Sequence, residues 1–122
     1  MTGLQKQMFH YLRKLQITVP EIEASAVISV DGLIIVSNLP EEVEGDRVSA
    51  LSAALLALGI RISTELKRGS LEQLYIRGVE GDILLMAAGE TAVLTVIANR
   101  QAKLGLVLYY MRRTVRELAV LL

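Results

Sequence analysis

The sequence predicts an α/β (α+β) fold in which a five-stranded, mostly antiparallel sheet carries helices on both faces. Three observations lead to this fold class. Apolar residues repeat at helical spacing in three segments, five shorter segments are apolar or alternating, and an Asp-Gly pair joins the first two of these. The predicted order is α-β-β-α-β-β-β-α, and the 122 residues, 1–122, are expected to form a single domain.

The first predicted helix is Thr2–Thr18, and Pro20 ends it because the residue before a proline is pushed out of the helical conformation. Two strands follow, Ala24–Val30 and Leu33–Ser37. The Asp31-Gly32 pair between them is typical of a tight hairpin, whose two central positions need positive φ. The apolar face of the helix consists of Leu4, Met8, Tyr11, Leu12 and Leu15.

The middle of the chain is predicted to form one long helix, Val48–Arg68, after a polar and acidic connector. Asp46 is the expected N-cap, since its carboxylate can accept hydrogen bonds from early backbone N–H groups. Lys67 and Arg68 suit the negative end of the helix dipole, and Gly69 can adopt a left-handed C-cap. The helix is therefore expected to end at these residues.

Three more strands and a helix complete the predicted fold. The strands are Leu71–Arg77, Asp82–Ala87 and Thr91–Ala98, with turn residues between them. Ile83–Met86 and Val93–Ile97 are apolar at successive positions, so both faces of these strands are expected to be covered. The closing helix is marked by apolar residues at helical spacing: Leu104, Val107, Leu108, Met111, Val115, Leu118 and Leu122.

The long helix carries two apolar stripes, whereas a helix of a small lone domain usually buries one. The first stripe is Val48, Leu51, Leu55, Leu58, Ile62 and Leu66. The second is Ala53, Leu56, Ala57 and Ile60. We expect the first stripe to pack on the domain's own sheet. The second then needs another surface, and a second copy of the chain can supply it.

Composition narrows the classes of function. The chain is 52% hydrophobic and 21% charged with no net charge, which predicts a folded protein and gives no electrostatic case for a nucleic-acid partner. It has no cysteine, which excludes disulfides and thiolate metal sites and fits a cytoplasmic location. The most apolar segment, Ala53–Ile60, is shorter than the roughly 20 residues of a membrane-spanning helix, so no transmembrane segment is expected.

Catalytic patterns are nearly absent. The one histidine, His10, has no nucleophile or carboxylate near it in sequence, so a structural role is favoured over a general base. The acidic segment Glu41–Asp46 lacks the spacing of a calcium loop, and Gly78–Asp82 does not open a helix as a phosphate-binding loop does. We therefore expect no catalytic, cofactor-binding or metal-binding residues, and a protein that is not an enzyme.

Basic residues gather toward the end of the chain. Arg112, Arg113 and Arg116 lie on the polar side of the closing helix, where they favour the helix dipole and solvation. Together with Arg100 and Lys103 they could instead dock an acidic partner or lipid. The sequence favours the first interpretation and leaves the second open.

The Ala26–Ser37 hairpin, the Ala/Leu-rich helix after an acidic loop, the Gly-Asp-Ile-Leu-Leu-Met segment and the closing helix together resemble the roadblock/dynein light-chain family. The resemblance implies a profilin-like three-layer domain without catalysis of its own. It implies homodimers that join through the middle helix and an edge strand. Members bind Ras-like small GTPases, and bacterial and archaeal ones include regulators of gliding motility.

By this resemblance the dimer surface comprises Ala53, Leu56, Ala57 and Ile60 with strand residues Leu71, Gln73, Tyr75 and Arg77. The Ile60→Glu substitution is then expected to break the dimer. The polar residues beside this stripe are the expected GTPase contacts: Arg61, Thr64, Lys67 and Arg68. The alternative is a small-ligand sensor of similar shape, with a cavity between sheet and helix lined by Met86, Met111 and Tyr75.

Overall fold

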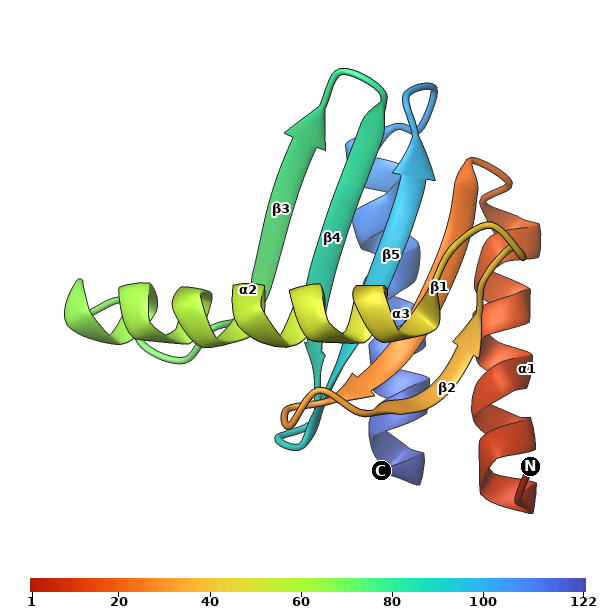
Figure 1. The fold of residues 1–122 in the computed structure, drawn as a ribbon, viewed down its shortest axis with the longest axis horizontal. Coiled ribbons are helices and arrows are strands. Elements are labelled where there is room, and N and C mark those ends of the chain that lie inside the picture. Colours follow the sequence, from red (N-terminus) through yellow and green to blue (C-terminus); the bar gives the residue numbers. More distant parts are fainter.

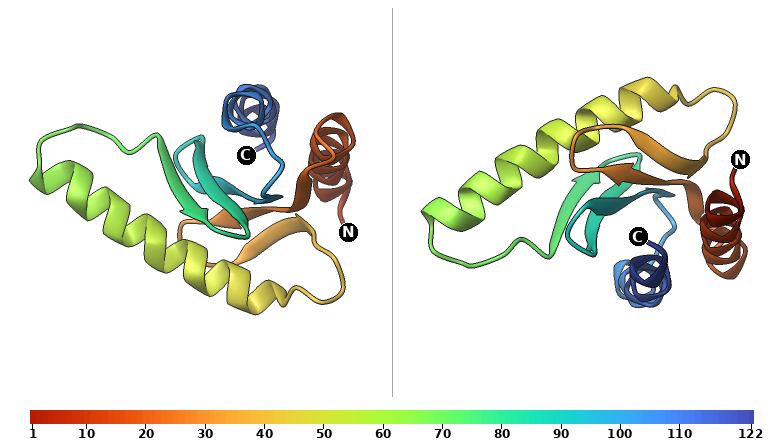
Figure 2. Two further views of the ribbon diagram at one scale, coloured as in Figure 1. Left: turned by 90° about the horizontal axis from the view of Figure 1, so that it is seen from above. Right: turned by 90° about the horizontal axis from the view of Figure 1, so that it is seen from below.

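The computed structural model describes residues 1–122 and arranges them in three layers (Figure 1). The elements are α1 (Gly3–Thr18), β1 (Ile22–Ser29), β2 (Ile34–Asn38), α2 (Gly45–Glu65), β3 (Gln73–Gly78), β4 (Gly81–Ala88), β5 (Ala92–Asn99) and α3 (Leu104–Leu121). The strands form one antiparallel sheet in the order β2-β1-β5-β4-β3. The views along the layers show α1 and α3 on one face and α2 on the other (Figure 2). The predicted fold class and element order are confirmed.

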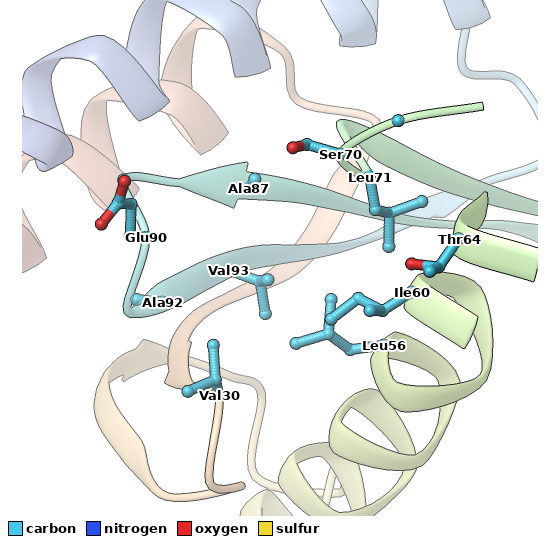
Figure 3. A pocket seen from close by; sticks show the side chains of 12 residues that line it. Val30, Leu56, Ile60, Thr64, Ser70, Leu71, Ala87, Glu90, Ala92 and Val93 are labelled. Atoms are coloured by element: carbon cyan, nitrogen blue, oxygen red, sulfur yellow. The ribbon is translucent and has the colours of Figure 1, made fainter. Parts of the chain in front are cut away.

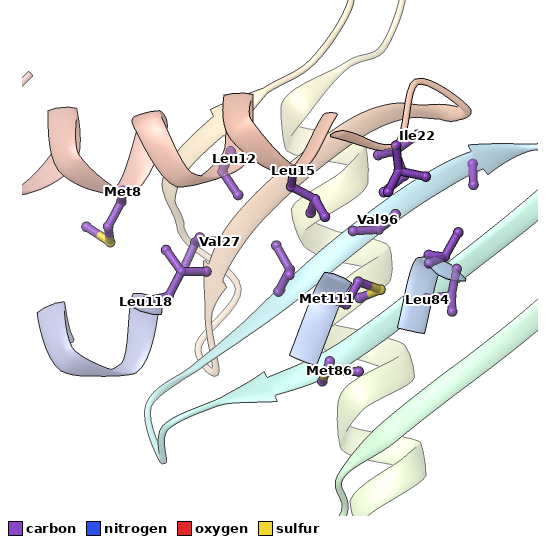
Figure 4. Close-up of a cluster of buried hydrophobic side chains, with 14 of the residues drawn as sticks. Met8, Leu12, Leu15, Ile22, Val27, Leu84, Met86, Val96, Met111 and Leu118 are labelled. Carbon is purple, nitrogen blue, oxygen red and sulfur yellow. The ribbon is translucent and has the colours of Figure 1, made fainter. Parts of the chain in front are cut away.

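The two faces of the sheet are covered unequally. A cluster of 16 buried residues fills the layer between the sheet and the α1/α3 pair, where Met8, Leu12, Met111 and Leu118 meet Val27 and its neighbours (Figure 4). The cluster beneath α2 has only five buried members: Ala26, Ile28, Leu56, Leu85 and Val93. The α2 face therefore retains apolar surface that the chain itself does not cover.

The helix ends follow local capping chemistry. Thr2 and Gln5 form a capping box at α1, in which Gln5 N–H donates to Thr2 Oγ1 at 3.1 Å and Thr2 N–H donates to Gln5 Oε1 at 2.9 Å. At α2 the predicted N-cap Asp46 is wrong. The helix starts three residues before Val48, Glu44 is the N-cap residue, and Asp46 lies in the first turn.

The predicted end of α2 also differs from the structure. The helix ends at Glu65, and the next residues form a Schellman motif. Arg68 N–H donates to Ser63 C=O at 2.7 Å, and Lys67 N–H donates to Thr64 C=O at 3.1 Å. Lys67 occupies the left-handed position with φ of 57°, which the sequence assigns to Gly69. Gly69 lies beyond the motif, so the helix end is set by backbone bonds and not by the glycine.

The two edges of the sheet differ in a way that bears on association. The register of β1 with β2 shifts at Ile35, and the carbonyl of Ile35 accepts a 3.0 Å hydrogen bond from Gln5 Nε2 of α1. A bulge and a covering helix thus close the β2 edge. In contrast, β3 pairs with β4 in unbroken register and has no strand on its outer side. The β3 edge is therefore the one open to another strand.

The α2 helix is long and apolar enough to span a bilayer by length and composition, with a mean hydropathy of 1.3 over its most apolar window. Core helices meet the same criterion. Here α2 lies across the strands of its own sheet, and the buried Thr95 hydroxyl donates to Ser52 Oγ at 3.1 Å. The apolar character of α2 therefore agrees with a helix that packs on the sheet with one side and leaves apolar side chains uncovered on its other sides.

Candidate functional site

The contact between α2 and the sheet is built from small residues. The buried residues of α2 are Ser49, Ser52, Leu56 and Gly59, which recur at helical spacing. A Cβ atom at Gly59 would lie only 2.9 Å from Leu74 Cδ1 of β3, so the absence of a side chain lets the helix approach the sheet edge. With small residues beneath it, α2 lies close to the sheet and its large side chains point to either side.

This geometry overturns the predicted roles of the two stripes. Leu51 and Leu58 of the first stripe are 63% and 55% exposed, and Ile62 and Leu66 are also exposed. Val48 and Leu55 of the same stripe are half-buried and pack against the cluster beneath α2. The prediction that the stripe lies on the sheet therefore holds for these two residues and is wrong for the other four, because the line of small residues takes that place.

The second stripe is divided by the same arrangement. Leu56, predicted at a dimer surface, is 7% exposed and belongs to the domain's own core. Ala53 is half-buried beside Gly32 of the β1–β2 turn, since a Cβ at Gly32 would lie 3.2 Å from the Ala53 Cβ. Ala57 and Ile60 are exposed. Leu56 therefore offers little area to any partner.

Two grooves flank α2. The first, the Leu58 groove, has a volume of about 430 Å³. Its lining is almost entirely apolar and comprises Val48, Leu51, Ser52, Ala54, Leu55 and Leu58 of α2 with Ile76, Ile83, Leu85, Thr95 and Ile97 of the sheet. Ile83 is 38% exposed here, so the expectation that both faces of β4 are covered fails at this residue, whereas Leu85 on the same face is buried. The helix crosses the sheet without reaching this part of it.

The second groove, the Ile60 groove, lies on the opposite side of α2 and has a volume of about 610 Å³ (Figure 3). Leu56, Ile60 and Thr64 of α2 face Ala92 and Val93 of the sheet across it. Glu90, in the β4–β5 turn, and Ser70 make parts of its rim polar. The two stripes of the sequence thus line two different grooves.

The open edge of β3 presents backbone groups that follow from its pairing with β4. Ala87 N–H donates to Glu72 C=O, so Glu72 is bonded to the β4 side. In an antiparallel ladder the bonded residues alternate, which turns the N–H and C=O groups of Gln73, Tyr75 and Arg77 outward. These are three of the strand residues that the sequence nominates for the dimer surface, and all three are exposed.

The predicted GTPase-contact residues gather at the C-terminal end of α2 and just beyond it. Arg61 pairs with Glu65 at 3.1 Å, and the Arg61 side chain is exposed. Arg68 Nε donates to Leu66 C=O at 3.1 Å, which folds the side chain back over the helix end. Thr64 lines the Ile60 groove, and Lys67 is exposed. The four residues therefore lie at the C-terminal end of α2, where Ile62 and Leu66 are also exposed.

The residues weighed for a metal site, a general base and a ligand cavity lie apart in the structure. No group of three or more His, Asp or Glu side chains is placed to hold a metal ion. His10 is exposed on α1 beside the ring of Tyr11. Met86 and Met111, expected to line a ligand cavity, are buried in the larger core, whereas Tyr75 is partly exposed on the edge strand. The three residues do not share one cavity wall.

The order of layers and strands defines a profilin-like three-layer domain. Acanthamoeba castellanii profilin IA superimposes with a TM-score of 0.63, at 14% identity, over 91% of this chain and 95% of that protein. Residues 8–98 match the family model of the Roadblock/LC7 domain. The chain belongs to the Roadblock/LC7 family.

Three further proteins show how this chain relates to others. An uncharacterized protein of Methanocaldococcus jannaschii, MJ1340, is 35% identical over 97 residues, which are 80% of this chain and 84% of that protein. A structure described as MglB with tetrameric arrangement has a TM-score of 0.92 at 18% identity, over 99% and 91% of the two chains. The gliding protein MglB of Thermus thermophilus has a TM-score of 0.89 at 17% identity, over 99% and 92%.

Proposed function

We propose that this protein is a non-enzymatic, cytoplasmic interaction module that forms a homodimer and binds a Ras-like small GTPase. One observation carries the dimer: apolar side chains on α2 and on the sheet line an uncovered groove beside the one open sheet edge. The dimer surface consists of the Leu58 groove and the β3 edge. This proposed surface includes Tyr75, as the sequence predicts, but it contains Leu58 in place of the predicted Leu56.

A two-fold axis through the β3 edge accounts for both features at once. Gly59 lies against Leu74 and Leu71, so α2 crosses β3 near the start of the strand. The helix then continues past the sheet edge (Figure 1). Antiparallel pairing of two β3 strands, centred on Tyr75, places the partner's α2 near the other end of β3. There it covers Ile76 and Ile83, the sheet residues of the Leu58 groove.

Exposed apolar side chains support such an association. Leu51, Leu58, Ile62, Ile76 and Ile83 are all between about two-fifths and two-thirds exposed. Full burial of such a side chain contributes about 1.5–3 kcal/mol, so covering the exposed part contributes about 1 kcal/mol or slightly more. Two-fold symmetry counts each residue twice. The backbone bonds of the joined β3 strands fix the register of the two copies.

The GTPase assignment rests on the family resemblance and on the polar end of α2. Arg61, Thr64, Lys67 and Arg68 are exposed in the last turns of α2 and just beyond it, and the proposed dimer presents two such ends. Basic and hydroxyl side chains there suit the polar surface of a GTPase. The Ile60 groove lies beside Thr64 and stays outside the proposed dimer interface, so it is free for the same partner.

Two measurements test this function. Sedimentation velocity over a range of concentrations is expected to give a dimer, and a monomer throughout would contradict the dimer. Pull-down with a Ras-like GTPase loaded with GDP or a GTP analogue is expected to show nucleotide-dependent binding. Arg61→Glu combined with Arg68→Glu is expected to weaken that binding while the dimer persists. Binding that is unchanged in this variant would contradict the assigned contact.

A further inference from the structure

The positive charge of this chain is concentrated in α1 and α3. The two helices hold six of the 13 Lys and Arg residues but only one of the 13 Asp and Glu residues, Glu117. Seven bases and twelve acids remain for the rest of the chain, so a molecule with no net charge divides into a positive layer and a negative remainder. All six bases of the layer are exposed: Lys6, Arg13, Lys14, Arg112, Arg113 and Arg116.

These bases are largely unpaired within the molecule. Lys14 Nζ lies 3.5 Å from Glu117 Oε2 and links the two helices, and the Arg113 guanidinium lies 5.8 Å from the ring centre of Tyr110. The other four bases of the layer have no carboxylate within salt-bridge distance. On each helix the bases lie on the side away from the buried residues, as the helical spacing requires. Because α1 and α3 lie side by side on one face of the sheet (Figure 2), the charges share one outer surface.

Exposed apolar side chains lie among these bases. On α3, one side of the helix carries five residues at steps of three and four: Leu106, Tyr109, Arg113, Arg116 and Val120. The three apolar residues are exposed, Val120 to 85%. A solvated face has no need of large apolar side chains at these positions. Bases mixed with Leu, Tyr and Val are typical of surfaces that bind at a membrane interface.

We propose that the outer face of α1 and α3 docks on a membrane surface that contains anionic phospholipids. Headgroup phosphates pair with the bases, and Leu106, Tyr109 and Val120 enter the headgroup region. The bound state lies on the bilayer and does not span it. Charge complementarity selects the anionic lipid, and the apolar side chains select a membrane over a nucleic acid, which would engage only the bases.

The strength of this docking rests on the proposed dimer. A two-fold axis that joins two β3 strands in antiparallel fashion keeps corresponding faces of the two sheets on the same side. Both α1/α3 layers then face one membrane, which doubles the basic surface. The α2 helices and their polar ends face the opposite way. A GTPase bound there would be presented on the side away from the bilayer.

Vesicle co-sedimentation tests the proposal with purified protein. The wild type is expected to sediment with vesicles of phosphatidylcholine and phosphatidylserine, less so as salt rises, and not with phosphatidylcholine alone. Arg112→Gln with Arg116→Gln is expected to weaken binding at least about 30-fold, from about fivefold per charge removed. The matched single substitutions are Arg112→Gln on α3, expected to weaken binding about fivefold, and Arg47→Gln on α2, which removes an exposed base from the opposite face and is expected to bind like the wild type.

A second pair of substitutions separates membrane from nucleic acid. Leu106→Ser with Val120→Ser is expected to weaken vesicle binding on the order of tenfold while its salt dependence stays unchanged. Equal sedimentation of the Arg112→Gln and Arg47→Gln variants would overturn the proposal. So would wild-type binding to a DNA duplex as tight as to anionic vesicles. Sedimentation velocity without lipid reports the dimer independently, so a dimer that ignores vesicles refutes only the membrane surface.

Discussion

Replacing Leu58 and Leu56 by alanine, one at a time, separates the roles of two opposite sides of α2. Leu58 is 55% exposed and lines the uncovered groove, whereas Leu56 is 7% exposed within the core. Leu58→Ala is therefore expected to weaken the dimer and leave the fold intact. Leu56→Ala is expected to destabilise the fold and to change the dimer only indirectly.

The magnitudes follow from burial. Covering the exposed half of Leu58 contributes about 1–1.5 kcal/mol per copy, or about 2–3 kcal/mol for the two copies at a two-fold interface. That loss raises the dissociation constant about 30- to 150-fold. Leu56→Ala removes a packed side chain, which typically lowers the free energy of unfolding by about 2–5 kcal/mol.

Sedimentation velocity across a dilution series gives the dissociation constant of each variant. Urea unfolding at several protein concentrations gives the stability of the monomer separately, because a dimer makes the midpoint depend on concentration. The reasoning is refuted if Leu58→Ala dimerises like the wild type. It is equally refuted if Leu58→Ala lowers monomer stability as much as Leu56→Ala, since Leu58 would then be a core residue.

Other substitutions test single features. Tyr75→Pro removes an outward N–H group of β3 and is expected to abolish the dimer, while circular dichroism shows that the fold is retained. The control Ile76→Pro removes a hydrogen bond to β4 and is expected to destabilise the fold. Ile60→Glu changes the Ile60 groove and is expected to weaken the dimer less than Leu58→Glu does, as measured by gel filtration. A larger effect of Ile60→Glu would place the interface on the other side of α2. Gln5→Glu keeps the capping acceptor but removes the donor to Ile35 C=O. The free energy of unfolding in urea is expected to fall by about 1–2 kcal/mol, and an unchanged value would contradict the role of this hydrogen bond. Lys67→Gly relieves the positive φ and is expected to raise the unfolding free energy by up to about 1 kcal/mol; a decrease would show that the lysine side chain stabilises the turn.

The element order could be predicted because each segment carries a local signal. The Asp31-Gly32 pair marks the position of the hairpin, Pro20 ends the first helix, and apolar spacing marks all three helices. The predicted two-residue turn is wrong in detail, because only Gly32 has positive φ, of 89°, and Ser29 and Leu33 close a three-residue loop. Helix ends were less predictable. Backbone hydrogen bonds from Lys67 and Arg68 end α2, and the position of a glycine in the sequence does not predict them.

The orientation of α2 could not be predicted from apolar spacing. Both stripes have helical periodicity, and periodicity does not say which one faces the sheet. The deciding residues are Ser49, Ser52 and Gly59, whose small size lets the helix lie close to the strands. The exposed Ile83 depends on long-range placement, because only the path of α2 across the sheet leaves that side chain uncovered.

The central claim is that two copies join through the β3 edge with Tyr75 at the two-fold axis. The chain has no cysteine, so one introduced thiol reports a single contact. Paired residues in an antiparallel ladder have Cα atoms about 4.5–5.5 Å apart, within disulfide range. Under mild oxidation Tyr75→Cys is expected to form a covalent dimer that is reversed by reductant, and Ile60→Cys is expected to stay monomeric on a denaturing gel. A covalent dimer from Ile60→Cys and none from Tyr75→Cys would contradict the claim.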